Sequence, residues 1–338
     1  MAVKILFCFY PLFVRWNQGI ALLSATCKER GVETSLYLLE NPDKFADYLM
    51  ANPPDYLGFS CVTVHDYRLS LPFMAVAKES RVPTLLGGVY PRRGSPLDAP
   101  VDYICRGEAE WGLPDFLLTG NTRVFEEKRI FLDLNLLPIP DYDLFAGIPY
   151  NRRLPFWPEA TILPYSSSRG CPYRCFFCES ALQPPGVRIR TRVKEDLAFL
   201  TGKYRPDVIC FSEELLPYYS RQWRESWEEF EYPFVSYIRA DITEDQLIWL
   251  QAKGLRGCFF GVESGNEQYR NMVLGKQLSD KNLMRTVGLL REMQIPYVAF
   301  YIRGAPQETW KIQGETVWMS REIGGYPVFC RYENLKEL

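Results

Sequence analysis

Short apolar segments alternate with amphipathic helical patterns through the first 120 residues, and this alternation restricts the fold more than any other feature of the chain. The strand candidates are residues 3–10, 34–39, 56–62, 84–88 and 103–106, and the helical patterns between them lie at about 18–30, 43–51, 66–80 and 109–118. Because strands that alternate with helices pair in parallel, residues 1–120 are predicted to form an α/β, doubly wound, Rossmann-like sheet.

A stretch rich in proline and aromatic residues follows at 121–160 and includes Leu137 to Pro140 and Pro149 to Pro158. Such a stretch does not sustain a helix or a central strand, so we expect a linker between two domains. Beyond it, six more strand candidates alternate with helices and predict a second parallel domain over 161–338, at residues 161–168, 208–212, 234–238, 257–262, 297–302 and 328–332.

Charge and hydropathy exclude several classes of partner. The formal net charge is −2 and the isoelectric point is near 5.8, so no basic excess favours a nucleic-acid partner. The first apolar run, Ile5 to Val14, lacks the cleavage site of a signal peptide and is interpreted as a strand. Since no apolar stretch reaches the roughly 18 residues that cross a bilayer, we expect a soluble, cytoplasmic protein with no membrane partner.

Three cysteines, Cys171, Cys175 and Cys178, lie on one predicted loop just after the first strand candidate of the second domain. Three thiolates at this spacing can hold three irons of a cubane cluster and leave the fourth iron open for a substrate or cofactor. The alternative is a structural zinc site, but that site needs a fourth ligand, and the only histidine, His65, lies far upstream. The spacing therefore favours an iron–sulfur cluster.

The Cys-x3-Cys-x2-Cys loop, with Phe177 just before its last cysteine, resembles the radical S-adenosylmethionine (SAM) superfamily. The resemblance implies a partial (β/α)6 TIM-type barrel over 161–338, a [4Fe-4S] cluster on the three cysteines, and SAM chelating the open iron. It also implies reductive cleavage of SAM to a 5′-deoxyadenosyl radical. An electron donor of flavodoxin or ferredoxin type and a small-molecule or peptide substrate are implied with it.

Further segments match this superfamily at successive barrel strands, where functional side chains lie at the carboxyl ends. The carboxylate after the second strand would lie near the SAM amino group, and strand alternation favours Glu213 over Glu214. Its alternative is a helix-capping or solvated carboxylate. For two other residues the alternative to a SAM role is a buried salt bridge between Arg239 and Glu263. By resemblance, the residues that contact SAM are Phe177, Glu213, Arg239, Glu263, Ile302 and Gly304.

The Gly87-Gly88 turn and the stretch from Val101 to Glu108 resemble the cobalamin-binding domain that precedes the barrel in one branch of the superfamily. The resemblance implies a cobalamin site at the carboxyl edge of the first sheet, formed by Trp16, Gly19, Ser60, Cys61, Gly87, Gly88, Val89, Tyr90, Gly107 and Glu108.

The histidine that ligates cobalt in the best-known of these domains is absent here. When Gly19 is aligned with the glycine of the Asp-x-His-x-x-Gly motif, Trp16 takes the position of the histidine and Val14 that of the aspartate. Two interpretations remain: cobalamin bound without a protein ligand, its lower face covered by Trp16, or a relic domain that binds nothing. Alternatively, Trp16 is a surface or interface aromatic, and His65 is a loop residue outside the motif.

Taken together, the resemblance implies a cobalamin-dependent (class B) radical SAM methyltransferase that transfers a methyl group from methylcobalamin to an unactivated carbon. One alternative is a radical SAM enzyme that catalyses cyclisation, rearrangement or oxidation without methyl transfer. Another is a cobalamin- or redox-sensing binding protein. Detection of 5′-deoxyadenosine separates enzyme from sensor, and detection of S-adenosylhomocysteine separates the methyltransferase from the other enzymes.

Overall fold

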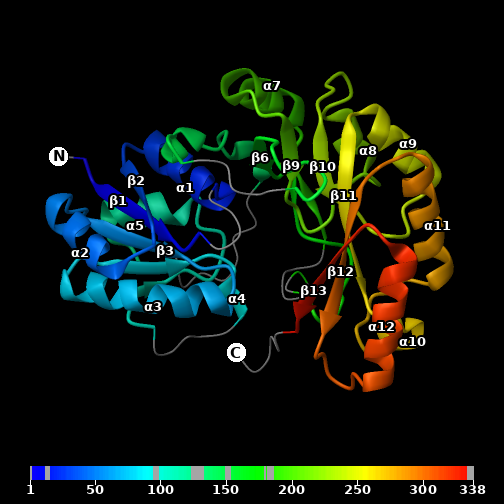
Figure 1. Ribbon diagram of the computed structural model, residues 1–338. Helices are drawn as coiled ribbons and strands as arrows, with labels where there is room; N and C mark the ends of the chain where they lie inside the picture. The colour runs from blue at the N-terminus through cyan, green and yellow to red at the C-terminus, as the bar shows by residue number, and fades with distance from the viewer. Residues whose placement is uncertain are drawn as a thin grey trace. The chain divides into compact units, whose positions relative to one another are not determined.

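A computed structural model describes residues 2–11, 16–93, 99–122, 133–148, 154–178, 180 and 186–332 (Figure 1). The chain divides into two compact units, residues 1–152 and residues 153–337. Among the described residues, every helix is too short or too polar to span a bilayer.

The first unit is built on a parallel sheet with strand order β2-β1-β3-β4-β5. This is the flavodoxin-like version of the doubly wound fold, in which ligands bind where the strand order reverses, between β1 and β3. All five predicted strands are confirmed within a few residues, as β1 (Lys4–Phe9), β2 (Glu33–Leu38), β3 (Tyr56–Ser60), β4 (Thr84–Gly87) and β5 (Tyr103–Ile104).

Helices cover this sheet, and their starts are fixed by side-chain caps. Asn17, Asn41 and Thr63 each accept a hydrogen bond from a backbone N–H of the first turn, which satisfies donors that a helix leaves unpaired. The helices are α1 (Gln18–Glu29), α2 (Pro42–Ala51), α3 (Val64–Glu79), the short α4 (Tyr90–Arg93) and α5 (Gly112–Thr119).

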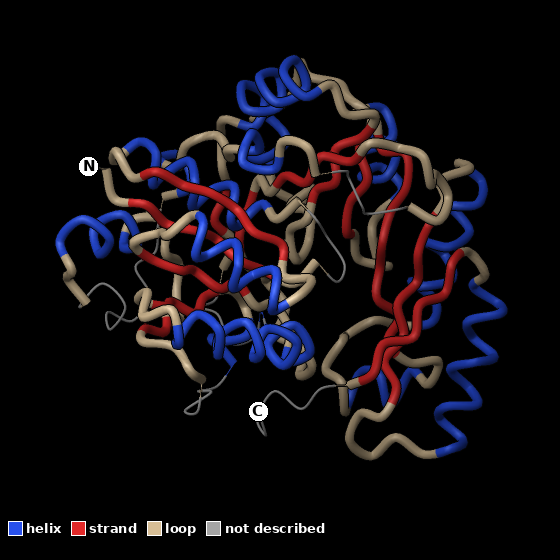
Figure 2. Tube along the Cα trace, turned by 60° about the vertical axis from the view of Figure 1, so that its left-hand side comes forward, coloured by secondary structure: helices blue, strands red, loops and turns tan. Residues whose placement is uncertain are grey.

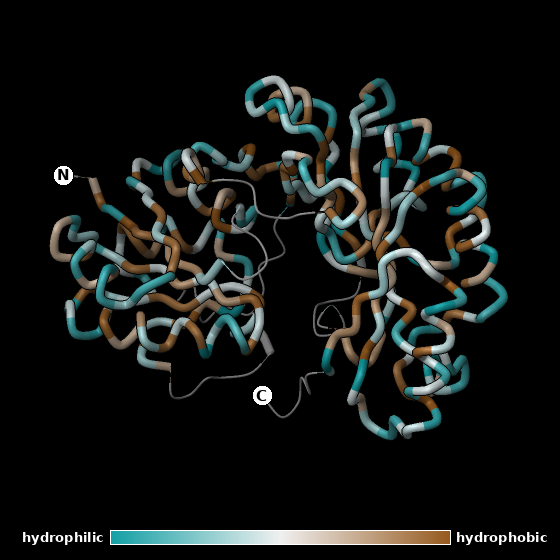
Figure 3. Tube along the Cα trace, viewed as in Figure 1, coloured by the Kyte–Doolittle hydropathy of each residue, from teal (hydrophilic) through white to brown (hydrophobic). Residues whose placement is uncertain are grey.

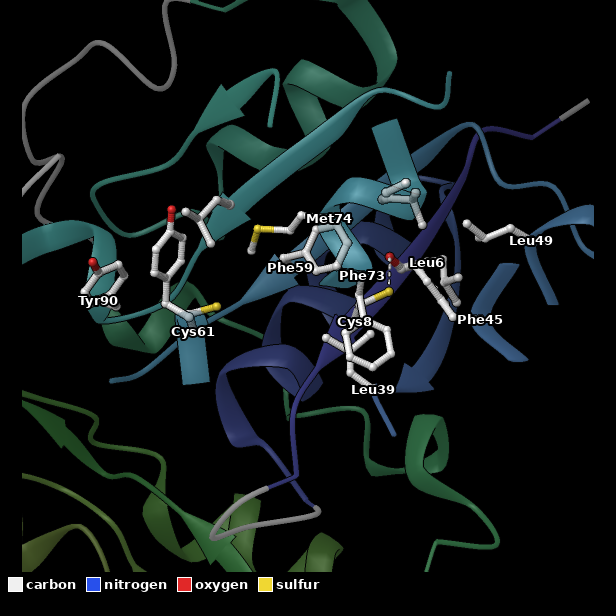
Figure 4. Packing of buried hydrophobic residues seen from close by; sticks show 14 of the residues in the cluster. Leu6, Cys8, Leu39, Phe45, Leu49, Phe59, Cys61, Phe73, Met74 and Tyr90 are labelled. Atoms are coloured by element: carbon white, nitrogen blue, oxygen red, sulfur yellow. Dashed lines mark hydrogen bonds between the residues drawn. The ribbon is translucent and has the colours of Figure 1, made fainter. Parts of the chain in front are cut away.

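One face of the sheet packs against α2 and α3 through a single apolar cluster (Figure 4). Leu6 and Cys8 of β1 and Phe59 of β3 meet Phe45 of α2 and Phe73 of α3 there. Alternate residues of β1, such as Ile5 and Phe7, are buried on the opposite face, as expected for a sheet covered on both sides. The strands of this sheet are accordingly rich in hydrophobic residues, which Figure 3 colours brown.

The segment predicted to be an interdomain linker is packed over residues 133–148 and 154–160. Residues 133–148 contain two 3-10 helices, η1 (Leu134–Leu136) and η2 (Tyr142–Phe145), and belong to the first unit. Asp141 accepts a hydrogen bond from Ser24 and pairs with Lys28, both on α1. Prolines exclude long helices here, but they leave room for short turns that pack, and the linker interpretation is therefore wrong for residues 133–148.

The second unit is a parallel sheet whose six strands follow their order in the sequence, and Figure 2 draws the strands of the protein in red. That order, with a helix after most strands, is the arrangement of a partial (β/α)6 barrel. All six strand predictions are confirmed, as β6 (Ile162–Tyr165), β9 (Val208–Phe211), β10 (Phe234–Tyr237), β11 (Leu255–Glu263), β12 (Tyr297–Arg303) and β13 (Tyr326–Arg331). The helices are α7 (Val193–Tyr204), α8 (Arg221–Glu225), α9 (Glu244–Ala252), α10 (Glu267–Met272), α11 (Asp280–Glu292) and α12 (Trp310–Ile323).

The inward face of this sheet is filled by strand residues and by residues 154–160, with no helical residue in the cluster. Val208 and Cys210 of β9 and Phe259 of β11 line it, and Phe156 packs against them. A Cβ at Gly257 of β11 would overlap the Phe156 ring, so the glycine makes room for this aromatic plug. Residues 154–160, also predicted as linker, are thus part of the second unit's core.

Candidate functional site

The cysteine loop leaves the barrel directly after β6 and is closed by a short antiparallel ladder that sequence reasoning missed. Strand β7 (Ser168–Arg169) pairs with β8 (Arg188–Ile189), so the loop between them is fixed at both ends. Gly170 has φ +94°, and a Cβ there would overlap the carbonyl oxygen of Gly186. Only glycine fits at this position, one residue before Cys171.

The three predicted cluster ligands lie together on this loop. Cys175 is buried, Cys171 and Cys178 are half-buried, and the Cys178 N–H donates to the Cys175 carbonyl oxygen at 3.0 Å. Burial raises the pKa of Cys171, and the nearby thiols of Cys178 and Cys175 raise it further, so the three sulfurs are within electrostatic reach of one another.

The donor set of this loop suits an iron–sulfur cluster. Among the described residues, no three His, Cys, Asp or Glu side chains converge as ligands of one metal ion. A cubane cluster does not need such convergence, because each thiolate binds a different iron. Burial raises the pKa of Cys175, but Lys276 and Arg239 lower it, and the same cations would offset thiolate charge around a bound cluster.

Glu263 lies at the carboxyl end of β11 in an unusual backbone conformation. Its φ is +68°, a left-handed value that is strained for a residue with a side chain. The carboxylate is buried, and its Oε1 lies 2.7 Å from Nζ of Lys276. A Cβ at Gly261 would overlap Glu263 Oε1 and lie 2.7 Å from the Lys276 Nζ, so the ion pair occupies the space that the glycine leaves open.

Arg239 follows β10 and is engaged by protein groups on several sides. Its Nε lies 2.8 Å from Asp241, and its Nη2 donates to the backbone carbonyl oxygens of Lys276 and Gln277. Its guanidinium carbon lies 3.8 Å from the ring centre of Tyr173, on the cysteine loop. The direct Arg239–Glu263 salt bridge considered from the sequence is absent from the described residues, since each partner pairs with another group.

Glu213 and Glu214 take opposite sides after β9. Glu213 is fully buried, and its Oε1 accepts hydrogen bonds from the N–H and the hydroxyl of Ser167, at 2.6 and 2.5 Å. The Ser167 hydroxyl also accepts a hydrogen bond from the indole N–H of Trp223, on α8. Strand alternation correctly groups Glu213 with Phe211, but that face packs against the helix layer, because Phe211 contacts Trp223.

Glu214 instead points toward the cysteine loop. Its Oε2 accepts a hydrogen bond from the Gly170 N–H at 3.3 Å, and its charge raises the pKa of Cys171 after the larger effect of burial. Of the two carboxylates, the one beside the cysteines is therefore the one that strand alternation did not favour.

The remaining predicted SAM residues gather around one apolar cluster near the loop. Phe177 and Ile302 pack together with Tyr269 and Ala305. Gly304 has φ +79°, and its N–H donates to Glu308 Oε2 at 2.5 Å. The structure thus brings a ring from the cysteine loop and an aliphatic side chain from β12 into the same cluster, beside an uncrowded glycine backbone.

In the first unit, the predicted cobalamin residues of the third and fourth loops form one tight corner at the carboxyl edge. Gly88 has φ +101°, and a Cβ there would overlap the Cys61 carbonyl oxygen. The same oxygen accepts the Tyr90 N–H at 3.0 Å, and the Tyr90 ring stacks on Tyr67. Gly87 accepts the Cys61 N–H, so backbone contacts hold the two loops together.

The other predicted cobalamin residues are spread along the same edge. Ser60 ends β3, Val89 lies between the Gly87-Gly88 turn and α4, and Gly107 and Glu108 follow β5. Gly19 is exposed in the first turn of α1. Each lies after or near the carboxyl end of a strand, where this fold places ligands.

Trp16 packs inside the first unit. The side chain is 8% exposed, its Nε1 donates to the Ile148 carbonyl oxygen at 2.9 Å, and its ring stacks on Tyr142 and Phe145 of η2. It is therefore not the surface aromatic considered as its alternative. His65 is exposed in the first turn of α3, while Val14 lies outside the described residues.

Lys276, Ser167 and the ladder β7–β8 were not anticipated. Lys276 lies on a loop between α10 and α11 and has no motif around it, so its approach to Glu263 depends on chain folding rather than on local spacing. Its Nζ also lies 5.6 Å from the ring centre of Phe177. The Gly275-Lys276-Gln277 run offered one signal, a glycine in a polar loop.

Two solved structures of TsrM, a radical S-adenosylmethionine methyltransferase from Kitasatospora setae, resemble this chain over 99% of its length. The one with tryptophan substrate and a SAM analogue bound is 14% identical, is covered over 75% of its own chain and gives a TM-score of 0.74. The one with cobalamin and a [4Fe-4S] cluster bound is 13% identical, is covered over 74% and gives a TM-score of 0.74. At these identities the likeness shows the fold alone, and the predicted Rossmann-like parallel sheet followed by a partial (β/α)6 barrel is confirmed.

A curated but uncharacterized methyltransferase of Pyrococcus horikoshii is 24% identical across 66% of this chain and 50% of its own length. The chain thus matches half the length of that relative. No protein-family model matches the chain.

Proposed function

We propose that this chain is a cobalamin-dependent radical SAM methyltransferase that acts on an unactivated carbon of a small-molecule substrate. The observation that carries the proposal is the cysteine loop directly after the first strand of a barrel sheet that itself follows a 2-1-3-4-5 sheet. The likeness to TsrM over nearly the whole chain supports this reading. The electron donor is proposed to be of flavodoxin or ferredoxin type.

Cys171, Cys175 and Cys178 would hold the [4Fe-4S] cluster. Their all-thiol donor set, the glycine-dependent turn at Gly170 and the nearby cations suit a cluster with one open iron. When bound there, the cluster would supply the electron for reductive cleavage of SAM, and cobalamin would supply the methyl group.

The chain's own residues would bind SAM from two sides of the cluster. Glu263 would supply a buried carboxylate for the ribose hydroxyls or the methionyl part, and Glu214, which accepts a hydrogen bond from the Gly170 N–H, would meet the SAM amino group. Ile302, Phe177 and the open backbone of Gly304 offer an apolar surface for adenine. These groups would bind and orient SAM and would exclude water, as a site that generates a reactive radical requires.

Glu213 is less suited to that role than the sequence suggested. Its Oε1 accepts two hydrogen bonds from Ser167, and Phe211, two residues earlier on the same face of the strand, packs against Trp223 of α8. Arg239 already bonds Asp241 and two backbone carbonyl oxygens. It would have to break some of these bonds before two N–H groups of its guanidinium could pair bidentately with the SAM carboxylate.

Cobalamin would lie at the carboxyl edge of the first sheet, over the turn Gly87 to Tyr90 and the loops after β3 and β5. The fit rests on the strand order, whose reversal between β1 and β3 marks the ligand position in such sheets, and on the close backbone approach at Gly88. Trp16 would support this edge from beneath through η2, because its ring is already packed within the unit.

Mass spectrometry of SAM-derived products tests the proposal. The anaerobically reconstituted protein is incubated with SAM, unmethylated cobalamin and a low-potential reductant. The methyltransferase predicts both 5′-deoxyadenosine and S-adenosylhomocysteine. 5′-Deoxyadenosine without S-adenosylhomocysteine would favour a cyclase, mutase or oxidase. The absence of both products would contradict the proposal that the protein is an enzyme.

A further inference from the structure

Arg239 contacts the cysteine loop through Tyr173, which lies between Cys171 and Cys175. The guanidinium carbon is 3.8 Å from the centre of the tyrosine ring, a stacking distance. The arginine is 5% exposed, so this contact is sheltered from water. A planar guanidinium can stack on a ring while it donates hydrogen bonds in its own plane.

Those in-plane donors reach a second loop, residues 274–277. Nη2 donates to the carbonyl oxygens of Lys276 and Gln277, the latter at 2.7 Å, and Nε is held by Asp241. Gly275 and Gln277 have φ values of +67° and +54°, so the backbone of this loop takes left-handed conformations on both sides of Lys276. Glycine tolerates this conformation, but at Gln277 it is strained, and a strained backbone persists only where surrounding contacts hold it.

The 274–277 loop in turn touches the cysteine loop directly. The Phe176 N–H donates to the Leu274 carbonyl oxygen at 3.0 Å. Lys276 Nζ lies 5.6 Å from the ring centre of Phe177. The cysteine loop is therefore contacted by Arg239 at residue 173 and by the 274–277 loop at residues 176 and 177. Arg239 links these two contacts, because it also bonds the 274–277 loop.

We propose that Arg239 is a positioning residue that braces the cysteine loop, so that the three thiols are already in place when the cluster is inserted. This inference rests on the proposed function and reassigns the SAM-carboxylate role that the sequence suggested for Arg239. Ordering a loop costs conformational entropy, and a brace provides that order before the cluster arrives.

The test compares Arg239→Gln and Arg239→Lys with Arg291→Gln in the full-length chain before reconstitution. Arg291 is a matched control, because its Nη2 also donates to two successive carbonyl oxygens, those of Glu322 and Ile323, at 2.7 and 2.8 Å. The first readout is the rate of trypsin cleavage after Arg174, an exposed residue inside the cysteine loop, normalised to the unfolded chain. The second is iron bound per chain after reconstitution.

Both Arg239 variants should be cut after Arg174 roughly ten- to hundredfold faster than wild type, the range that corresponds to losing one charged hydrogen bond. They should also take up less than half the wild-type iron. Arg239→Lys should not restore wild-type cleavage or iron uptake, since an ammonium cannot stack on a ring and donate several in-plane hydrogen bonds at the same time. Arg291→Gln should match wild type in both readouts.

Tyr173→Leu keeps the proposal testable if the Arg239 variants do not fold. It removes the stacked ring and leaves the arginine's bonds to residues 276 and 277 intact, and it should also speed cleavage and reduce iron uptake. Wild-type cleavage in Tyr173→Leu and in the folded Arg239 variants overturns the brace. So does normal iron uptake with a loss of SAM affinity in Arg239→Gln, which would make the residue a SAM ligand. A wild-type chain that binds no cluster contradicts the proposed function, and the cleavage rates still decide the brace.

Discussion

Lys276 Nζ and Glu263 Oε1 lie 2.7 Å apart in space that Gly261 leaves open. The pair joins residues 13 positions apart, from the end of a barrel strand and from the loop that also contacts the cysteines. Because the glutamate has a left-handed backbone, its carboxylate is folded back toward its own strand. This carboxylate is the proposed SAM ligand, and its position therefore depends on the absence of a side chain at Gly261, two residues earlier.

Gly261→Ala should weaken SAM binding. The added methyl group would overlap Glu263 Oε1 and force the carboxylate out of its place. Loss of one charged hydrogen bond to SAM is worth about 1.5–3 kcal/mol, so the dissociation constant should rise roughly ten- to hundredfold. Equilibrium binding to the cluster-loaded protein measures this change.

Gly288→Ala is the control for that variant. Gly288 lies within α11 and no atom lies within 4 Å of its added Cβ, so the same substitution creates no clash there. It should leave SAM affinity unchanged and leave stability equal or slightly higher, because alanine is the better helix former. Equal SAM affinity in Gly261→Ala and Gly288→Ala would remove Glu263 from the SAM site.

The stability of the protein should fall as Glu213 ionises. Burial raises the pKa of Glu213 to about 7, although the hydrogen bonds from Ser167 lower it. The folded state therefore binds the proton more tightly than the unfolded state, so this stabilisation is complete below about pH 4 and is lost as the pH rises through about 7. Glu213→Gln should gain roughly 2–4 kcal/mol relative to wild type between pH 4.5 and 8.

Denaturant unfolding of both proteins at several pH values measures that difference. A gap between wild type and Glu213→Gln that stays constant with pH would show that Glu213 has an ordinary pKa in the folded protein.

Glu214→Gln should lower SAM affinity, whereas Glu213→Gln should not. Glu214 lies beside Gly170 and Cys171, while Glu213 is bonded to Ser167 on the helix-covered face. Isothermal titration of both variants with SAM, at matched cluster content, compares them directly. The reverse order of affinities would restore the carboxylate that strand alternation favours.

The sequence predicts strands well here because apolar runs bounded by glycine, proline and charged residues leave few alternatives, and all eleven strand candidates have a counterpart. It predicts the cysteine ligands because their chemistry is encoded in local spacing. It favoured Glu213, whereas Glu214 lies beside the cysteine loop, since alternation defines two faces without telling which one the helices cover. Lys276 and the aromatic plug at Phe156 were missed because both depend on contacts between segments distant in sequence.

Bound cob(II)alamin should show no nitrogen hyperfine structure from a histidine ligand in its electron paramagnetic resonance spectrum. The chain has one histidine, and His65 is exposed at the start of α3, outside the loop where the motif histidine would lie. Trp16 cannot ligate cobalt through its indole nitrogen, because the lone pair of that nitrogen belongs to the aromatic ring and its N–H donates to the Ile148 carbonyl oxygen. A nitrogen-ligated spectrum that disappears in His65→Ala would place His65 at cobalt.

The most direct test of the account is electron paramagnetic resonance of the reduced, reconstituted protein with and without SAM, combined with iron and sulfide analysis. Wild type should hold four irons per chain, as expected for one [4Fe-4S] cluster, and SAM should shift the spectrum by binding the open iron. The triple variant Cys171→Ala, Cys175→Ala, Cys178→Ala should lose the cluster. Unchanged iron content in that variant, or a wild-type spectrum that SAM leaves unaltered, would contradict the claim that these three cysteines hold a SAM-binding cluster.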